Sequence, residues 1–162
     1  MDTGMALLRE VETLLYDEAD CLDRADLEGW IRLYTEDGTY WMPAAPGQED
    51  PLNHISHFYD DRVMMEIRKR NFVHPRAASK DHPVRCSHLI GNIRLLGSED
   101  TAGTLKVRSN FHAMLFYREE TRLFGGRYEH ELQRSSEGLR IRRKRVDLID
   151  CDAPHKSIVI YL

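Results

Sequence analysis

The sequence has few cysteines and no long apolar run. Its three cysteines, Cys21, Cys86 and Cys151, are odd in number and far apart, which fits reduced thiols in a cytoplasmic protein better than a secreted disulfide framework. No stretch reaches the roughly 18 apolar residues that a membrane span requires, and Asp2 and Arg9 interrupt the apolar pattern that a signal peptide would need. The net charge of −4 lacks the positive excess of a typical nucleic-acid-binding protein. We therefore expect no membrane span and no nucleic acid partner.

The chain is expected to form a single domain over residues 1–162, because no repeat, linker or low-complexity tract divides it. Apolar residues recur at three- and four-residue steps from about residue 5 to 23, which predicts an amphipathic helix. Asp26 is a suitable N-cap for a short second helix that places Trp30 and Tyr34 in the core. This helix is expected to stop before a turn at Asp37-Gly38.

Strand patterns dominate the rest of the chain. A short strand over 39–42 is followed by a proline-containing loop over 44–58, and Asp60-Asp61 is expected to open a third helix. Four long strands are predicted, followed by an apolar tail; they lie near 84–97, 103–118, 122–135 and 139–150, and the tail covers 158–162. This order predicts an α+β fold in which a cone-shaped, curved antiparallel sheet wraps over the N-terminal helices. The fold is similar to the cystatin-like scaffold of ketosteroid isomerase, scytalone dehydratase and nuclear transport factor two, which hosts enzymes and non-enzymes.

Short motifs along nearly the whole chain carry a more specific resemblance. They are Tyr16-Asp17-Glu18-Ala19, Trp30 to Tyr34, Tyr40-Trp41-Met42-Pro43-Ala44, Asp60-Asp61-Arg62, Ser87-His88 with Asn92-Ile93, Ser109-Asn110-Phe111, and Phe124-Gly125-Gly126. In this order and spacing they resemble the β subunits of bacterial aromatic-ring-hydroxylating dioxygenases of the benzoate and biphenyl types. The resemblance implies a non-catalytic, structural β subunit of an oxidoreductase in aromatic compound catabolism. It also implies an α subunit that carries a Rieske 2Fe-2S cluster and a mononuclear iron, a homotrimer of this chain, and an α3β3 hexamer.

Iron ligands are sparse in this chain. A Rieske cluster needs two cysteines and two histidines in paired Cys-x-His and Cys-x-x-His loops, and only Cys86-Ser87-His88 has one of these spacings. A thiol beside a hydrogen-bonded histidine is the favoured interpretation. A mononuclear iron would need two histidines and a carboxylate; the candidates His54, His57, Glu49 and Asp50 fall in the proline-containing loop, where a surface or contact role is favoured. No cofactor or metal is therefore expected in this chain.

A pocket enzyme of the same fold is the alternative function. Dehydratases and isomerases pair a histidine with a carboxylate or tyrosine for proton transfer beside a carbonyl. His88 and His112 lie on strand faces that could line the cone, with Asp37 or Tyr40 as partners. A structural histidine is the favoured interpretation at both positions.

The basic run 140–145 is the last informative feature. Strand alternation places Arg143 and Arg145 on the face of Ile141. There they would pair with carboxylates such as Glu129, Glu131 and Asp147, or with a neighbouring subunit. A solvated face is equally open, since a bulge resets the alternation. The 44–58 loop and its flanks would expose apolar side chains unless they cover a core or another chain. The predicted subunit contacts are Trp41, Phe58, Arg140, Arg142, Arg143 and Arg145. Gly125-Gly126 lacks a phosphate-loop context and predicts a bulge or close packing.

Overall fold

A computed structural model describes residues 2–73 and 83–162 of the chain. Within these residues the chain forms helices α1 to α3 and strands β1 to β6. The elements are α1 (Thr3–Asp23), α2 (Leu27–Arg32), β1 (Tyr34–Pro43), β2 (Ser56–Asp61), α3 (Arg62–Val73), β3 (Arg85–Leu95), β4 (Thr104–Tyr117), β5 (Glu120–Ser135) and β6 (Gly138–Leu148). No helix in this described part is long and apolar enough to cross a bilayer.

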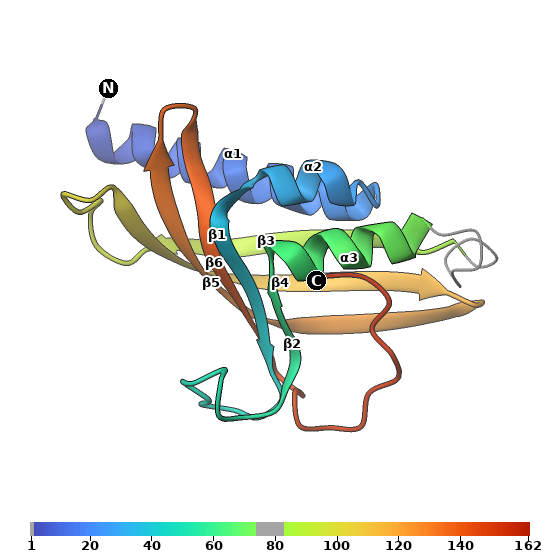
Figure 1. The fold of residues 1–162 in the computed structure, drawn as a ribbon. Coiled ribbons are helices and arrows are strands. Elements are labelled where there is room, and N and C mark those ends of the chain that lie inside the picture. Colours follow the sequence, from blue (N-terminus) through green and yellow to red (C-terminus); the bar gives the residue numbers. More distant parts are fainter. Residues whose placement is uncertain (1, 74–82) are drawn as a thin grey trace.

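The strands form one curved sheet with the order β2-β1-β6-β5-β4-β3. All neighbouring pairs are antiparallel except β1 and β6, which pair in parallel. The helices lie on one face of this sheet, and the C-terminal end of the sequence returns to lie beside α3 on that same side (Figure 1). The predicted cone-shaped α+β fold is confirmed.

The N-terminal helices form for the predicted local reasons. The Asp2 carboxylate accepts a hydrogen bond from the Gly4 amide at the start of α1, and Asp26 accepts one from the Gly29 amide in α2. Each cap satisfies an amide that has no partner inside the helix. Trp30 and Tyr34 are both buried, as predicted. Tyr34, however, is the first residue of β1 and not the last residue of α2.

Two local predictions around β1 and β2 are wrong. Asp37-Gly38 lies inside β1 and forms no chain-reversing turn; the pairing of β1 with β6 shifts register between Tyr34 and Thr39. The irregular loop ends at residue 55, because 56–61 pair with β1 as strand β2. Short strands of this kind depend on a tertiary partner, which a local pattern does not reveal.

A bulge in β6 changes which basic residues face the core. Ile141 pairs with Leu132, but Arg143 pairs with Glu131, so one extra residue sits in β6 between them. The bulge reverses the alternation after Arg142. Lys144 is therefore buried. Arg143 and Arg145 lie on the opposite face, and their predicted placement on the face of Ile141 is wrong.

Close packing of β5 against β6 explains one of the paired glycines. A Cβ atom added at Gly126 would lie 2.0 Å from the Asp147 carbonyl oxygen. No side chain fits at such a separation, so the predicted close packing is confirmed at this position.

Candidate functional site

A buried ionic network lies inside the cone, between α1 and the sheet. The Glu18 carboxylate accepts hydrogen bonds from Lys144 Nζ, His130 Nε2 and Trp30 Nε1, each at 2.9 Å. Tyr34 donates a longer bond of 3.4 Å to the same carboxylate. Glu18, His130 and Lys144 are each about 1% exposed, so solvent does not screen the pair. Lys144 also lies 4.2 Å from the centre of the Tyr128 ring, a cation–π contact.

The network sets the protonation states of Glu18 and His130. Burial alone would raise the pKa of Glu18, but the Lys144 charge and the hydrogen bonds of His130 and Lys144 outweigh it and hold that pKa well below its usual range. Burial lowers the pKa of His130, so this imidazole is neutral at neutral pH. Glu18 is therefore a permanently ionised acceptor. It has no proton to donate, and protein donors occupy both of its oxygens.

The last residues of the sequence fill the interior beside this network. Lys144 Nζ donates to the Leu162 carbonyl oxygen at 2.9 Å. The Tyr40 hydroxyl accepts a hydrogen bond from the Leu162 amide at 3.0 Å and donates one to the Leu162 carbonyl oxygen at 3.1 Å. Tyr161 stacks on Trp30 with ring centres 4.3 Å apart and donates to Asp60 at 2.7 Å. Tyr161 and Leu162 thus fill the interior next to Glu18, Lys144 and Trp30. Tyr40 is buried, which raises its phenol pKa far above 10 and keeps it neutral.

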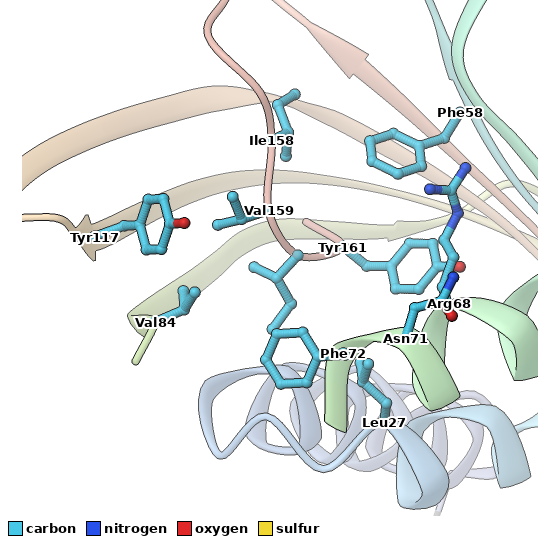
Figure 2. Close-up of a pocket in the computed structure, with 11 residues that line it drawn as sticks. Leu27, Phe58, Arg68, Asn71, Phe72, Val84, Tyr117, Ile158, Val159 and Tyr161 are labelled. Atoms are coloured by element: carbon cyan, nitrogen blue, oxygen red, sulfur yellow. The ribbon is translucent and has the colours of Figure 1, made fainter. Parts of the chain in front are cut away.

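A smaller hollow remains at the mouth of the cone, between α3 and the C-terminal segment (Figure 2). Its volume of about 270 Å³ is below the roughly 300–1,000 Å³ of typical small-molecule sites. Two polar groups at its rim have partners: Arg68 is paired with Asp60 and lies over the Phe58 ring, and Tyr161 also binds Asp60. Most of the other lining residues are apolar, so the described part of this hollow offers mainly apolar contact.

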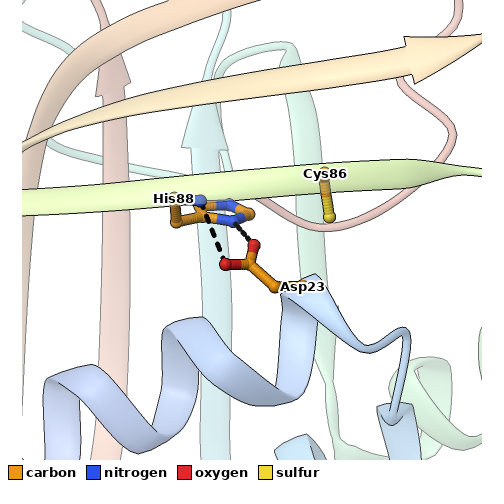
Figure 3. Close-up of side chains that lie close together, drawn as sticks. All are labelled: Asp23, Cys86 and His88. Atoms are coloured by element: carbon orange, nitrogen blue, oxygen red, sulfur yellow. Dashed lines mark hydrogen bonds and ion pairs between the residues drawn. The ribbon is translucent and has the colours of Figure 1, made fainter.

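His88 is paired with a carboxylate that was not predicted. Its Nδ1 lies 2.6 Å from Asp23 Oδ1, at the end of α1, and its main-chain amide donates to Asp23 Oδ2 at 3.1 Å. Cys86 lies two residues earlier on β3, with its thiol turned toward the same end of α1, where it donates to the Leu22 carbonyl oxygen (Figure 3). The interpretation of Cys86 as a thiol beside a hydrogen-bonded histidine agrees with this geometry.

The proposed enzyme set does not assemble in the cone. His112 and Asp37 are both exposed, since His112 lies on the outer face of β4 and Asp37 in the bulged part of β1. Tyr40 is inside the cone, but its hydroxyl is engaged by Leu162. Of the four predicted residues, only His88 and Tyr40 are buried, and Asp23 takes the place of Asp37 as the partner of His88.

The loop histidines do not form an iron site either. His54 is exposed, His57 is hydrogen-bonded to the Cys151 carbonyl oxygen, and Asp50 is bound to Leu52 and Asn53. Within residues 2–73 and 83–162, the single convergent group of three or more possible metal ligands is Asp23, Cys86 and His88. It holds one thiol and one imidazole, so this part of the chain does not fit a Rieske cluster, which needs two of each.

The outer face of the sheet carries a grid of charged side chains, called here the charged outer face. Across β4, β5 and β6, Lys106 pairs in register with Glu131 and then Arg143, and Arg108 pairs with Glu129 and then Arg145. Asn110, Arg127 and Asp147 form a third row. Opposite charges in neighbouring strands stabilise the sheet modestly. Surface hollows of about 620 and 360 Å³ lie over these rows.

Trp41 supports the β6 edge of the charged outer face. Arg143 and Arg145 lie over its ring at 5.0 and 4.5 Å, and its indole donates to Ser56 at 2.9 Å. Arg145 is also paired with Asp147 at 2.8 Å, one of the carboxylates predicted for this role. Trp41 is fully buried by its own chain, which corrects the expectation that it is an exposed contact residue. Phe58 is partly buried, packs against Tyr161 and lines the hollow at the mouth of the cone, so its contact role stays a prediction.

Arg140 and Arg142 also have partners within the chain. Arg140 is paired with Glu137 and the Arg32 carbonyl oxygen, and Arg142 lies 3.5 Å from Asp37 and 3.6 Å from Glu131. The Arg142 side chain is 46% exposed, so it remains accessible from outside.

The protein thus belongs to the class of cone-shaped α+β domains, and its interior is packed while its outer face is charged. More specifically, the chain is a member of the ring hydroxylating beta subunit family, whose model matches residues 17–153. It is 36% identical over 121 residues to the β subunit of toluate 1,2-dioxygenase from Pseudomonas putida, covering 71% of this chain and 74% of that protein. It is 32% identical over 157 residues to the small oxygenase component of the p-cumate 2,3-dioxygenase system from Pseudomonas putida, covering 94% and 86%.

Solved structures agree with this assignment. The β subunit of benzoate 1,2-dioxygenase from Burkholderia mallei superposes with a TM-score of 0.72 at 25% identity, covering 90% of this chain and 92% of that one. A naphthalene 1,2-dioxygenase chain superposes with a TM-score of 0.80 at 20% identity, covering 98% and 86%, which establishes likeness of fold. The resemblance inferred from the sequence motifs is confirmed.

Sequence reasoning missed the buried network, although part of its signal was present. Glu18 occupies the apolar stripe of α1, four residues before Leu22 and three after Leu15, where a lone charge requires a buried partner. The burial of Lys144 could not be predicted because the bulge in β6 changes the strand alternation. The pairing of Asp23 with His88 could not be predicted because the two residues are 65 positions apart in the sequence.

Proposed function

We propose that the chain is a non-catalytic, structural β subunit that supports a separate α subunit of a ring-hydroxylating dioxygenase. The observation that carries the proposal is the family match over residues 17–153 combined with an interior closed by the chain's own residues. A substrate would have to displace Tyr161 and Leu162 and compete with Lys144 for Glu18. The outer surface is therefore the part of the molecule that is free to act.

The chemistry is assigned to the partner in this proposal. The described residues do not fit a Rieske cluster, so the 2Fe-2S cluster and the mononuclear iron would belong to the α subunit. The relatives named above are components of toluate and p-cumate dioxygenases. An aromatic carboxylate is therefore the proposed substrate class of the complete oxygenase, and its catabolism the proposed role. Three free thiols fit the reducing environment of the cytoplasm.

The charged outer face is the proposed contact surface. Arg142, Arg143 and Arg145 lie on it, and planar guanidinium groups pair well with carboxylates across a subunit boundary. The 44–55 loop borders it through Glu49 and exposes Leu52 and Ile55, which are 79% and 83% exposed. We propose that these parts contribute to contacts in a β trimer and an α3β3 hexamer.

Reconstitution tests the function. The chain and its cognate α subunit are purified separately and together, and iron content, aromatic dihydroxylation and particle mass are measured for each. Iron and turnover should follow the α subunit, and the mixture should be more active and larger than α alone. Full activity of α without this chain would overturn the scaffold proposal. Turnover by this chain alone, lost in His88→Gln, would favour the pocket enzyme.

A further inference from the structure

We propose that Asp23, Cys86 and His88 form a binding site for a zinc ion that joins the end of α1 to strand β3. One donor atom from each residue lies within 4.8 Å of the other two. Thiolate, imidazole and carboxylate are the donors that zinc uses in proteins, whereas magnesium and calcium take oxygen ligands alone. Figure 3 shows the three side chains converging between helix and strand.

The Asp23–His88 separation suits a tetrahedral ion after a small change, and the Cys86 sulfur lies within 4.8 Å of both donors. Bonds of about 2.0–2.3 Å place neighbouring donors of a zinc ion roughly 3.3–3.6 Å apart. Asp23 Oδ1 and His88 Nδ1 are now 2.6 Å apart, so they must separate by less than about 1 Å. Asp23 Oδ2 is held by the His88 amide at 3.1 Å, which orients the carboxylate and leaves Oδ1 to bind the ion.

His88 is placed to offer its Nδ1 atom to an ion, since that atom already faces the Asp23 carboxylate. Its side chain is 1% exposed, and its Nε2 atom is buried without a hydrogen-bond partner among the described residues. The ring is thus held through Nδ1 alone. Zinc binding at Nδ1 moves the ring proton to Nε2, so the tautomer change releases no proton. It leaves a buried N–H without an acceptor among the described residues, a cost that the metal bonds must exceed.

The charge balance also favours a divalent cation. A thiolate and a carboxylate together neutralise Zn²⁺, and the C-terminal end of α1 adds a partial negative charge. The Cys86 thiol donates a hydrogen bond to the Leu22 carbonyl oxygen, so it carries its proton when no ion is bound. On binding, the S–H bond breaks, an S–Zn bond forms and one proton passes to the solvent.

The fourth coordination position can be reached from outside. A groove of about 230 Å³ opens beside Asp23 and His88, and Asp23 keeps 27% of its side chain exposed. The groove is lined by Tyr16, Ala19, Asp20, Asp23, His88, Leu89 and Ile90. A water molecule can therefore complete the coordination.

Titration of the full-length chain with Co²⁺ and Zn²⁺, under reducing conditions and after chelator treatment, tests the site. We expect one ion per chain, a thiolate-to-cobalt charge-transfer band, release of one proton per zinc, and a melting temperature raised by roughly 5–10 °C at a 100-fold excess over Kd. Cys86→Ser should remove the charge-transfer band and weaken binding more than the roughly 10–100-fold typical of losing an outer-shell partner.

Matched variants make the result specific. Cys151→Ser and His112→Gln change a thiol and an imidazole elsewhere and should leave binding intact. Asp23→Asn keeps the side-chain shape and provides a second test should Cys86→Ser fold poorly, as judged by circular dichroism. The site is refuted if wild-type protein shows no cobalt–thiolate band, if Asp23→Asn and Cys86→Ser bind as wild type does, or if Cys151→Ser abolishes binding.

Discussion

Glu18 is the residue on which the interior depends. Its carboxylate joins α1 to β5 through His130 and to β6 through Lys144, and Trp30 adds a contact from α2. A buried ion pair of this kind is often no more stabilising than well-packed apolar residues, but removal of one partner leaves the other charge unpaired. The network therefore specifies how helix and sheet fit together more than it adds net stability.

A double-mutant cycle tests this view. Glu18→Gln should lower the free energy of unfolding by roughly 3–5 kcal/mol, because Lys144 is left charged and buried. Adding Lys144→Met should recover part of that loss, since no unpaired charge remains. Chemical denaturation of the two single variants and the double variant gives the coupling. Strictly additive losses would show that the two residues act independently.

Stability should also depend on pH through the buried histidines. Burial lowers the pKa values of His88 and His130 below their ordinary 6.5. A depressed folded-state pKa gives stability that is complete above the unfolded value and is lost as the pH falls. Unfolding free energy should thus be flat above about pH 7 and fall below 6.5, by at most about 1.4 kcal/mol per pH unit for each histidine. The unfolding free energy measured across this range should depend less on pH in His88→Gln than in the wild-type chain.

At the scale of elements, local patterns predicted most of the fold but not its long-range pairing. The apolar period of α1, the Asp26 cap and strands β3 to β6 followed from sequence. Strand β2 and the bulge in β6 did not, because each is defined by a neighbouring strand that is remote in sequence. The same limit applied to the site: His88 could be singled out by its strand face, but its partner Asp23 could be identified only from the fold.

The packing of β5 against β6 gives a sharp test of one element. Gly126→Ala should be destabilising by at least the roughly 1–3 kcal/mol of an overpacked core, because the new methyl group would overlap the backbone of Asp147. Gly91→Ala is the matched control, since no atom lies within 4 Å of a Cβ at that position in β3. Thermal denaturation should separate the two variants. Equal stability of both would mean that β5 and β6 are not packed as described.

Helix α2 can be tested in the same way. Trp30 is fully buried, stacks on Tyr161 and donates to Glu18. Trp30→Ala should cost roughly 3–5 kcal/mol through the lost contacts and the cavity that remains. An unchanged denaturation midpoint would contradict the placement of this helix against the C-terminal segment.

Over the whole molecule, the charged groups of the interior are buried and paired within the chain, whereas those of the outer face are partly exposed. In the interior, Glu18, His130 and Lys144 bind one another, and Lys144 also binds the Leu162 carbonyl oxygen. The charged outer face carries rows of alternating charge whose ion pairs are partly exposed: Arg145 is paired with Asp147, and Arg142, 46% exposed, lies 3.5 Å from Asp37 and 3.6 Å from Glu131. Such a surface can exchange partners across a subunit boundary at little cost, because exposed ion pairs contribute little within one chain.

Charge reversal on the charged outer face tests the assembly. Arg142→Glu combined with Arg143→Glu should weaken association of the chain with itself or with its α subunit by at least about 10-fold, an effect of about 1.4 kcal/mol, because unfavourable charges would meet across the interface. The effect should shrink at high salt.

The control variant for this experiment must carry the same change in charge. Arg9→Glu combined with Arg32→Glu makes that change on α1 and α2, both at exposed positions on the helical side of the molecule. Light scattering with and without the α subunit measures association, and melting temperatures verify that both variants fold. Loss of assembly in the helix variant alone would move the interface to the helices. If neither variant changes assembly, the charged outer face is a solvated surface, and the exposed apolar loop at Leu52 and Ile55 becomes the next surface to alter.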